Sequence, residues 1–241
     1  MSPRRVVLAY SGGLDTSVAV RWMRETWDVA VHCVVVDVGQ EGGLDAGTRH
    51  ELDARATGAG AESCVVVDAR EELATRFCAP ALQANARYEG RYPLVSALSR
   101  PAIAAHLVDE ARRVGADAVA HGCTAKGNDQ VRFELGVRAL APRLEVLAPA
   151  REWGMTRPDA VAYAQKWSIP VAATVEKPFS IDENLFGRAI ECGELEDPWA
   201  RPPEAPYTRT RRTADDEVSF TLSFDAGLPS PSTARRWTSR R

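Results

Sequence analysis

The chain has 241 residues, of which 45% are hydrophobic, and a formal net charge of −3. This length suits one large domain or one domain with an arm, and the charge gives no general case for nucleic-acid binding. No apolar stretch reaches the roughly 20 residues that span a bilayer, so we expect no membrane contact. The start, Met-Ser-Pro-Arg-Arg, leads into an apolar strand and does not resemble a signal peptide.

The cysteines point to the cytoplasm. They are five in number and widely spaced, with no Cys-x-x-Cys pair. This pattern predicts reduced thiols and neither a zinc site nor a dithiol redox pair. We therefore expect a cytoplasmic protein without a metal site built from its own side chains.

Strand and helix patterns alternate through the first two thirds of the chain. Apolar strands are expected at 6–10, 31–38, 64–67, 118–120 and 144–147, with a last short strand at 171–174. Helices are expected at 16–27, 45–57, 70–85 with a break near Pro80, 99–114 with Ser99 as cap, 131–140, and 157–167 after a capping box at Thr156. Continuous apolar strands between amphipathic helices predict an α/β fold, a five-stranded parallel sheet with helices on both faces. Beyond Pro198 only 217–224 reads as a strand.

The segment 9–17 reads Ala-Tyr-Ser-Gly-Gly-Leu-Asp-Thr-Ser, directly after the first strand. The small residues Ser11, Gly12 and Gly13 allow backbone N–H groups to close around phosphate oxygens. The helix that follows points its positive end at the same anion. This is not a Walker A loop, because no Gly-Lys-Ser/Thr follows the glycines. The alternative is an ordinary glycine turn between a strand and a helix.

A second polar segment follows the fourth predicted strand, at 121–134. Asn128 and Arg132 are four residues apart and share a helix face if the helix begins at Asn128. An arginine and an aspartate in such a loop could bind the carboxylate and the ammonium of an amino acid. The alternative is a polar capping loop with a surface ion pair. Because ligands bind at the carboxyl ends of parallel strands, this segment and the glycine loop are expected on one rim.

Together these segments resemble the argininosuccinate synthase family of the ATP pyrophosphatase, or PP-loop, superfamily. The resemblance also includes the segments 37–40, 88–94, 99–101 and 180–185, and it extends from about Arg4 to about Trp199. It implies an adenine nucleotide alpha hydrolase-like fold followed by the start of a synthetase domain. We expect a nucleotide-binding domain at 1–170, an incomplete synthetase domain at 171–229 and a disordered tail at 230–241.

The resemblance implies a ligase of arginine biosynthesis (EC 6.3.4.5) that uses ATP with Mg²⁺. Citrulline attacks the α-phosphate to give citrullyl-AMP and pyrophosphate, and aspartate then displaces AMP to form argininosuccinate. The implied ATP-binding residues are Ala9, Tyr10, Ser11, Gly12, Gly13, Leu14, Asp15, Thr16, Ser17, Val36 and Gly122. Citrulline is expected at Tyr92, Ser96, Ala97, Asn128, Arg132 and Ser180, and aspartate at Thr124, Asn128 and Asp129. Asp15 and Asp129 are the expected catalytic carboxylates, although Asp15 could equally be a helix cap.

Two departures from the family pattern affect these expectations. Ala189 stands where the family has a serine that contacts citrulline, and the family continues into a second half that supplies further contacts and a helix for its homotetramer. We therefore expect a chain truncated at its C-terminal side, with a weakened tetramer. One hypothesis is that the tail is translated out of frame. GC-rich codons can be chosen for it that, shifted by one base, encode a family-like continuation. The alternatives are an inactive nucleotide-binding fragment of this family and another PP-loop ATP pyrophosphatase.

Overall fold

The computed structural model describes residues 4–40, 45–123, 127–171, 179–191, 193–209 and 221–230. Five parallel strands form the central sheet in the order β3-β2-β1-β4-β5. They are β1 (Arg4–Ala9), β2 (Val29–Asp37), β3 (Ser63–Asp68), β4 (Ala118–Ala120) and β5 (Glu145–Leu147). The predicted five-stranded parallel sheet is confirmed.

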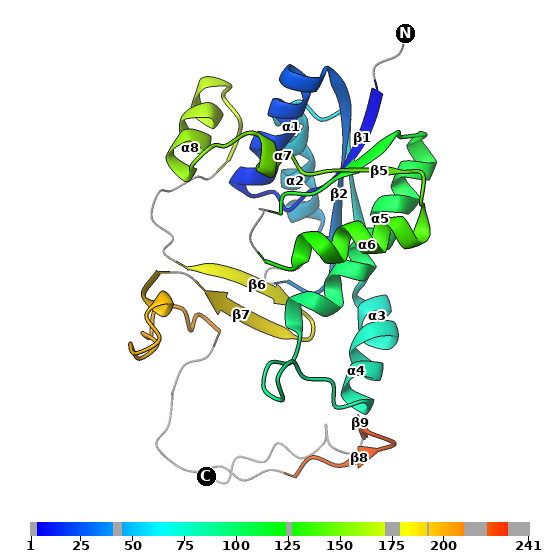
Figure 1. Cartoon of the computed structure of the whole chain (residues 1–241), viewed down its shortest axis with the longest axis vertical. Helices are drawn as coiled ribbons and strands as arrows, with labels where there is room; N and C mark the ends of the chain where they lie inside the picture. The colour runs from blue at the N-terminus through cyan, green and yellow to red at the C-terminus, as the bar shows by residue number, and fades with distance from the viewer. Residues whose placement is uncertain are drawn as a thin grey trace.

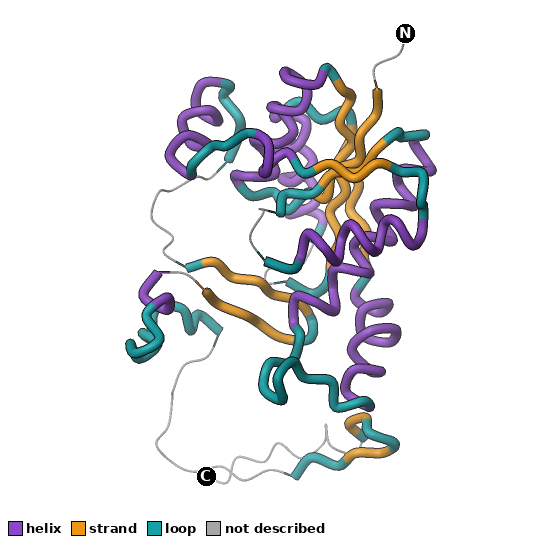
Figure 2. Tube along the Cα trace, viewed as in Figure 1, coloured by secondary structure: helices purple, strands orange, loops and turns teal. Residues whose placement is uncertain are grey.

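Helices cover both faces of this sheet (Figures 1 and 2). On one face, Val6 and Leu8 of β1 pack with buried residues of α1 (Leu14–Trp27), α2 (Ala46–Ala59) and α8 (Arg157–Lys166). On the other face, Val7 packs with residues of α5 (Val95–Val114) and α6 (Asp129–Leu140). The alternation of side chains along β1 explains this division, because successive residues of a strand point to opposite faces.

The remaining elements are short and lie around this core. They are α3 (Arg70–Glu72), a π-helical segment (Leu73–Cys78), α4 (Ala79–Gln83), α7 (Pro149–Glu152), a 3₁₀ turn (Gly193–Glu196), and the two hairpins β6 (Ser180–Asn184)–β7 (Gly187–Glu191) and β8 (Phe224–Asp225)–β9 (Leu228–Pro229). In the described part of the chain, no helix combines the length and apolar character that crossing a membrane requires.

The start of one helix differs from the expectation. Ser99 does not cap a helix: α5 already begins at Val95, and Ser99 is buried within it and donates to the carbonyl of Ser96 at 2.9 Å. The hydrogen bond from Asn184 Nδ2 to the carbonyl of Val95, 2.6 Å long, ties this extra turn to β6. The helical pattern expected over 70–85 with a break near Pro80 is observed as α3, a π-helical segment that ends just before Pro80, and α4.

The strand expected at 217–224 is largely untested. Most of it lies outside the described residues, and within the described part strand begins only at Phe224. The strand expected at 171–174 also lies almost entirely outside the described residues. The capping box at Thr156 and Asp159 is confirmed, with the Asp159 carboxylate accepting from the backbone N–H of Thr156 at 2.9 Å.

The strand order reverses direction between β1 and β4. Strands β2 and β3 continue to one side of β1, whereas β4 and β5 lie on its other side. In open parallel sheets such a reversal separates two neighbouring loops at the carboxyl ends of the strands and leaves a crevice for a ligand. The hairpin β6–β7 lies below this edge of the sheet in Figure 1, next to α5.

Candidate functional site

A cavity of about 870 Å³ opens at the carboxyl ends of β1, β2 and β4. The hairpin β6–β7 contributes its outer wall through Ile181, Asp182 and Glu183. Of the residues expected to bind ligands, eight line this cavity: Ala9, Tyr10, Ser11, Asp15, Thr16, Val36, Gly122 and Asp129. The glycine loop and the segment after β4 are therefore neighbours on one rim, as the strand order requires.

The glycine loop forms a bend whose hydroxyl groups are linked to one another. Ser11 Oγ lies 3.0 Å from Thr16 Oγ1 and accepts from the backbone N–H of Gly13 at 3.3 Å. Gly13 stands at the N-cap of α1 without a side-chain cap, and the first-turn N–H groups of a helix have no intrahelical acceptor. These donors and the positive end of α1 give the bend the chemistry of an anion-binding site.

Gly12 must be glycine for this bend to form. Its φ of +73° lies in the left-handed region, and a Cβ added there would lie 2.4 Å from Leu52 Cδ2. Its carbonyl accepts from Arg55 Nη1 at 2.7 Å, which fixes the peptide plane from the side of α2. The bend is therefore held by its neighbours before any ligand arrives.

The end of β2 offers backbone groups to the same cavity. Val36 lines it, and its carbonyl accepts only a long hydrogen bond, 3.4 Å, from Gln40 Nε2 among the described residues. The other end of the Gln40 amide accepts from the backbone N–H of Val38 at 2.9 Å. Gly39 has a φ of +86°, and its missing side chain leaves room for Leu185 at the turn of the β6–β7 hairpin. Leu185 donates its backbone N–H to the carbonyl of Val38 at 2.7 Å.

The segment after β4 contributes a buried histidine. His121 lines the cavity and stacks on Phe133 of α6, with ring centroids 5.4 Å apart. Burial, and to a lesser extent Arg151, lowers its pKa to about 4, although Glu134 acts in the opposite direction. Its Nδ1 accepts from the backbone N–H of Cys123 at 3.2 Å, which places the proton of the neutral ring on Nε2. Burial also raises the pKa of the Cys123 thiol to about 11, so this cysteine is not a reactive thiolate near neutral pH.

Asp129 connects the cavity to a cluster of charges. Arg132 donates to its Oδ1 at 2.8 Å, and Arg100 Nε donates to its Oδ2 at 2.8 Å. Arg100 also donates to Asp182 of β6, and Ser96 donates to the other oxygen of that carboxylate at 3.0 Å. The cluster thus joins α5, α6 and β6 beside the cavity.

Several expected ligand residues lie outside the lining of the cavity. Gly12, Gly13, Leu14 and Ser17 stand behind or beside it, and Ser17 is completely buried. Asn128 is the exposed N-cap of α6, and Tyr92 is exposed beyond the N-terminus of α5. Thr124 lies outside the described residues, and for Ser180 the structure describes only the backbone, in β6.

The carbonyl of Ala97 lies where α5 has no backbone donor for it four residues later. Pro101 stands four residues later inside α5 and has no N–H, so it cannot donate to the Ala97 carbonyl as a helix normally would. This leaves an acceptor at the side of α5 that also carries Ser96 and Arg100.

Arg100, Gln40 and Asp182 belong to the site but were absent from the expected ligand residues. Each stands within a segment that carried the family resemblance, so the signal was present at the level of the segment. Their roles depend on contacts between distant elements, because Arg100 and Asp182 are 82 residues apart. Sequence spacing alone could not reveal these contacts.

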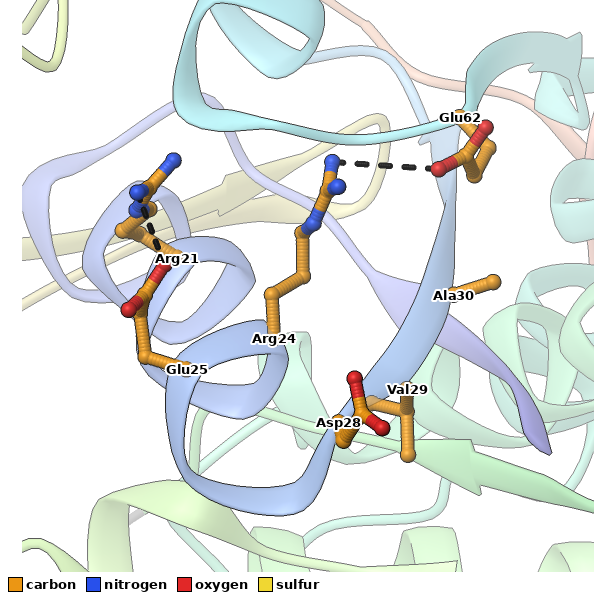
Figure 3. Close-up of a pocket in the computed structure, with 7 residues that line it drawn as sticks. All are labelled: Arg21, Arg24, Glu25, Asp28, Val29, Ala30 and Glu62. Atoms are coloured by element: carbon orange, nitrogen blue, oxygen red, sulfur yellow. Dashed lines mark ion pairs between the residues drawn. The ribbon is translucent and has the colours of Figure 1, made fainter. Parts of the chain in front are cut away.

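A second cavity, of about 510 Å³, lies at the opposite end of the sheet (Figure 3). Both of its arginines are paired with a carboxylate of the lining, Arg21 with Glu25 at 2.7 Å and Arg24 with Glu62 at 3.8 Å, and Asp28 adds a further negative charge. Because these cations are neutralised and the amino ends of parallel strands form the wrong edge for a ligand, we assign no site there. Over the described ranges, no group of three or more His, Cys, Asp and Glu side chains is arranged to hold a metal ion.

The chain is similar to known proteins over nearly its whole length. A family model described as the arginosuccinate synthase N-terminal HUP domain matches residues 5–170, and one described as the C-terminal domain matches 179–239. Argininosuccinate synthase from Gloeobacter violaceus is 51% identical over 95% of this chain and 57% of its own length. That from Bacillus licheniformis is 51% identical over 94% of this chain and 55% of its own.

Solved structures are more distant. A U34-tRNA thiolase from Methanococcus maripaludis has a TM-score of 0.44 and 14% identity, covering 74% of this chain and 61% of its own. The chain spans little more than half the length of the two synthases above. The N-terminal match alone includes more than half of its residues, and the chain therefore belongs to the argininosuccinate synthase family.

Proposed function

We propose that the protein is an ATP-dependent ligase that joins citrulline and aspartate to form argininosuccinate, releasing AMP and pyrophosphate through citrullyl-AMP. Family membership supports this reaction. The observation that carries the proposal is the shared cavity: Ser11 and Thr16 of the anion-binding bend line it together with Asp129. A phosphate group and an amino acid would therefore meet in one cavity.

The bend would hold the triphosphate of ATP. Its backbone N–H groups, the start of α1 and the hydroxyls of Ser11 and Thr16 provide donors where pyrophosphate leaves. Mg²⁺ bound with the nucleotide would neutralise charge on the phosphates, held largely by the nucleotide and waters. Asp15, exposed at the wall of the cavity, is the carboxylate that we propose for supporting this ion or the bend.

The nucleoside would lie between the ends of β2 and β4. The weakly occupied carbonyl of Val36 is an acceptor for an exocyclic amine. Gly122 leaves room for the nucleoside, because a Cβ at this residue would lie 3.1 Å from Thr16 Cγ2 and narrow the space between β4 and α1. We assign Ala9 and Tyr10 to the same end of the cavity.

The amino-acid substrates would lie at the charge cluster. Asp129 suits the ammonium of aspartate, and Arg132 suits a carboxylate of citrulline. These two groups pair with each other at 2.8 Å. The ammonium of aspartate and the carboxylate of citrulline could together replace this pair, so that no charge is left uncompensated. We assign Thr124 and Asn128 to aspartate, and Tyr92, Ser96, the Ala97 backbone, Asn128 and Ser180 to citrulline.

The proposal is tested with the purified chain. We expect release of AMP and pyrophosphate from ATP only when both citrulline and aspartate are present. Asp129→Asn should bind ATP normally but lose turnover, whereas Asp109→Asn, on the exposed face of α5, should behave as wild type. ATP binding without turnover would identify an inactive nucleotide-binding fragment, and turnover with a different acceptor would identify another ATP pyrophosphatase.

We further propose a cytoplasmic protein that self-associates as a homotetramer and binds neither nucleic acid nor membrane. Family resemblance supports the tetramer, and the net charge of −3 offers no general attraction for nucleic acid. The division into 1–170, 171–229 and a tail at 230–241 is part of the same proposal. Sedimentation of the purified chain measures its oligomeric state directly.

A further inference from the structure

Arg100 lies where three elements of the fold meet. It belongs to α5, its Nε donates to Asp129 Oδ2 of α6 at 2.8 Å, and its Nη2 donates to Asp182 Oδ1 of β6 at 3.2 Å. Its side chain is only 19% exposed. Burial opposes its charge, but Asp129 and Asp182 outweigh burial and raise the pKa of Arg100 above its ordinary value. The guanidinium is therefore a fixed cation between two carboxylates.

Each carboxylate has a second partner of its own. Asp129 accepts from Arg132 Nη1, and Asp182 accepts from Ser96 Oγ. Of these groups, Arg100 contacts both carboxylates. Removing its fork would separate the cluster into one pair on α6 and one hydrogen bond between α5 and β6.

Two hydrogen bonds hold the turn of the hairpin β6–β7, while farther along its strands Glu183 pairs with Arg209 and Arg188 donates to Thr208 at 2.7 Å. Leu185 donates to the carbonyl of Val38, and Asn184 Nδ2 donates to the carbonyl of Val95. Asp182 lies farther along β6, toward the end of the strand that carries Ser180. The contacts at the turn fix a pivot, and the contacts at Asp182 fix the direction in which the strand leaves it.

We propose that Arg100 is a positioning residue that holds the β6–β7 hairpin and Asp129 in a fixed relation, and so sets the distance between the two amino-acid subsites. The inference rests on the proposed function for its substrates. The guanidinium is planar and donates to both carboxylates at set angles, whereas a lysine ammonium is a point charge without this fork. Ligation requires the aspartate amine to reach the activated carbon of citrulline, and small errors in such placement reduce the rate strongly.

Hydrogen exchange of the hairpin tests the proposal without any need for turnover. In Arg100→Gln, amides of 181–184 and 187–190 should exchange about tenfold faster than in wild type, because opening of the hairpin becomes easier. Arg100→Lys should also exchange faster than wild type, since it retains the charge but not the fork. Arg112→Gln is the matched control: it is on the same helix, and its partners, exposed Asp109 and the carbonyl of Leu140, both lie outside the hairpin. Unchanged exchange in Arg100→Gln would overturn the proposal, and full protection in Arg100→Lys would overturn the role of the fork.

Asp182→Asn provides a second route to the same result. It leaves the bond between Arg100 and Asp129 in place and should loosen the same amides. The amides of the double variant with Arg100→Gln should exchange little faster than those of either single variant. Both substitutions remove the same contact, the one between Arg100 and Asp182. Additive effects would contradict a shared contact.

Kinetics separate positioning from simple loss of structure. If wild type turns over, Arg100→Gln should lower kcat about tenfold or more, while the affinity for ATP stays within about threefold. An equal loss of ATP affinity would overturn the positioning role, because the bend that binds phosphate would then also depend on Arg100. If wild type binds ATP but forms no product, the proposed function fails, and hydrogen exchange still decides whether Arg100 holds the hairpin.

Discussion

The hydroxyl of Tyr10 lies 2.8 Å from Ser17 Oγ, and both residues are almost completely buried at the base of the anion-binding bend. Tyr10 ends the strand side of the bend and Ser17 begins the second turn of α1, so this contact closes the loop between them. Burial raises the pKa of Tyr10 to about 12, which keeps the phenol protonated, although the hydrogen bond from Ser17 acts in the opposite direction. The pair supports the bend from behind.

Ser17→Ala should destabilise the protein by about 1–3 kcal/mol, because the buried Tyr10 hydroxyl loses its partner. Tyr10→Phe should cost less, since a serine hydroxyl in a helix can turn to the carbonyl of the preceding turn. Urea denaturation measures both, and the double variant should be less destabilised than the sum of the two. Additive losses would show that the hydroxyls do not act as a pair.

Thr16→Ala and Ser17→Ala should differ in nucleotide binding. Thr16 lines the cavity and its hydroxyl bonds to Ser11, so Thr16→Ala should weaken ATP binding about tenfold, the value of one good hydrogen bond. Ser17 is turned into the core, so Ser17→Ala should change the affinity by less than about threefold. Calorimetric titration of ATP gives both numbers. A larger loss of ATP affinity in Ser17→Ala than in Thr16→Ala would instead support Ser17 as a direct phosphate ligand.

Gly12→Ala should destabilise the protein by more than the cost of its left-handed backbone angle alone. A left-handed φ costs a residue with a Cβ about 1–2 kcal/mol, and here the Cβ also collides with Leu52. Gly154→Ala is the control, because Gly154 has a φ of +59° and no atom within 4 Å of an added Cβ. Thermal unfolding should show a larger loss of stability for Gly12→Ala than for Gly154→Ala. Gly12→Ala should also lose ATP binding. Equal losses would indicate that Leu52 moves aside.

The sheet and the bend could be predicted from sequence because their signals are local. Apolar runs fix the strands, and three small residues before a helix fix the bend. The start of α5 was predicted incorrectly, because Ser99 followed by Pro101 resembles the beginning of a helix. The true start at Val95 is bonded to Asn184, a residue 89 positions away.

The charge cluster shows the same limit within the site. Asp129 and Arg132 were expected to bind amino-acid groups, with an ion pair as the alternative, and in the structure they pair with each other. What the sequence did not indicate was that Arg100 would bind the same carboxylate from another helix and extend the cluster to β6. Local spacing identifies residue types that suit an amino-acid ligand, whereas the contacts between elements decide which of them are already paired.

The neutral ring of His121 predicts that stability falls in mild acid. Its pKa of about 4 in the folded protein lies below the ordinary value of 6.5, mainly because of burial. Above pH 6.5 both states carry a neutral ring and the residue adds no pH dependence. As the pH falls below 6.5, the unfolded chain takes up a proton that the folded chain does not, and this loss continues until the pH reaches about 4.

Between pH 7 and pH 5 this difference corresponds to about 2 kcal/mol of lost stability. His121→Gln should be less stable than wild type at pH 7, because it loses the stacking on Phe133, but its stability should fall less toward pH 5. His50→Gln, the same substitution at an exposed position, controls for the change itself. Urea denaturation at the two pH values measures this loss. If wild type and His121→Gln lose the same stability between pH 7 and pH 5, another group takes up the proton.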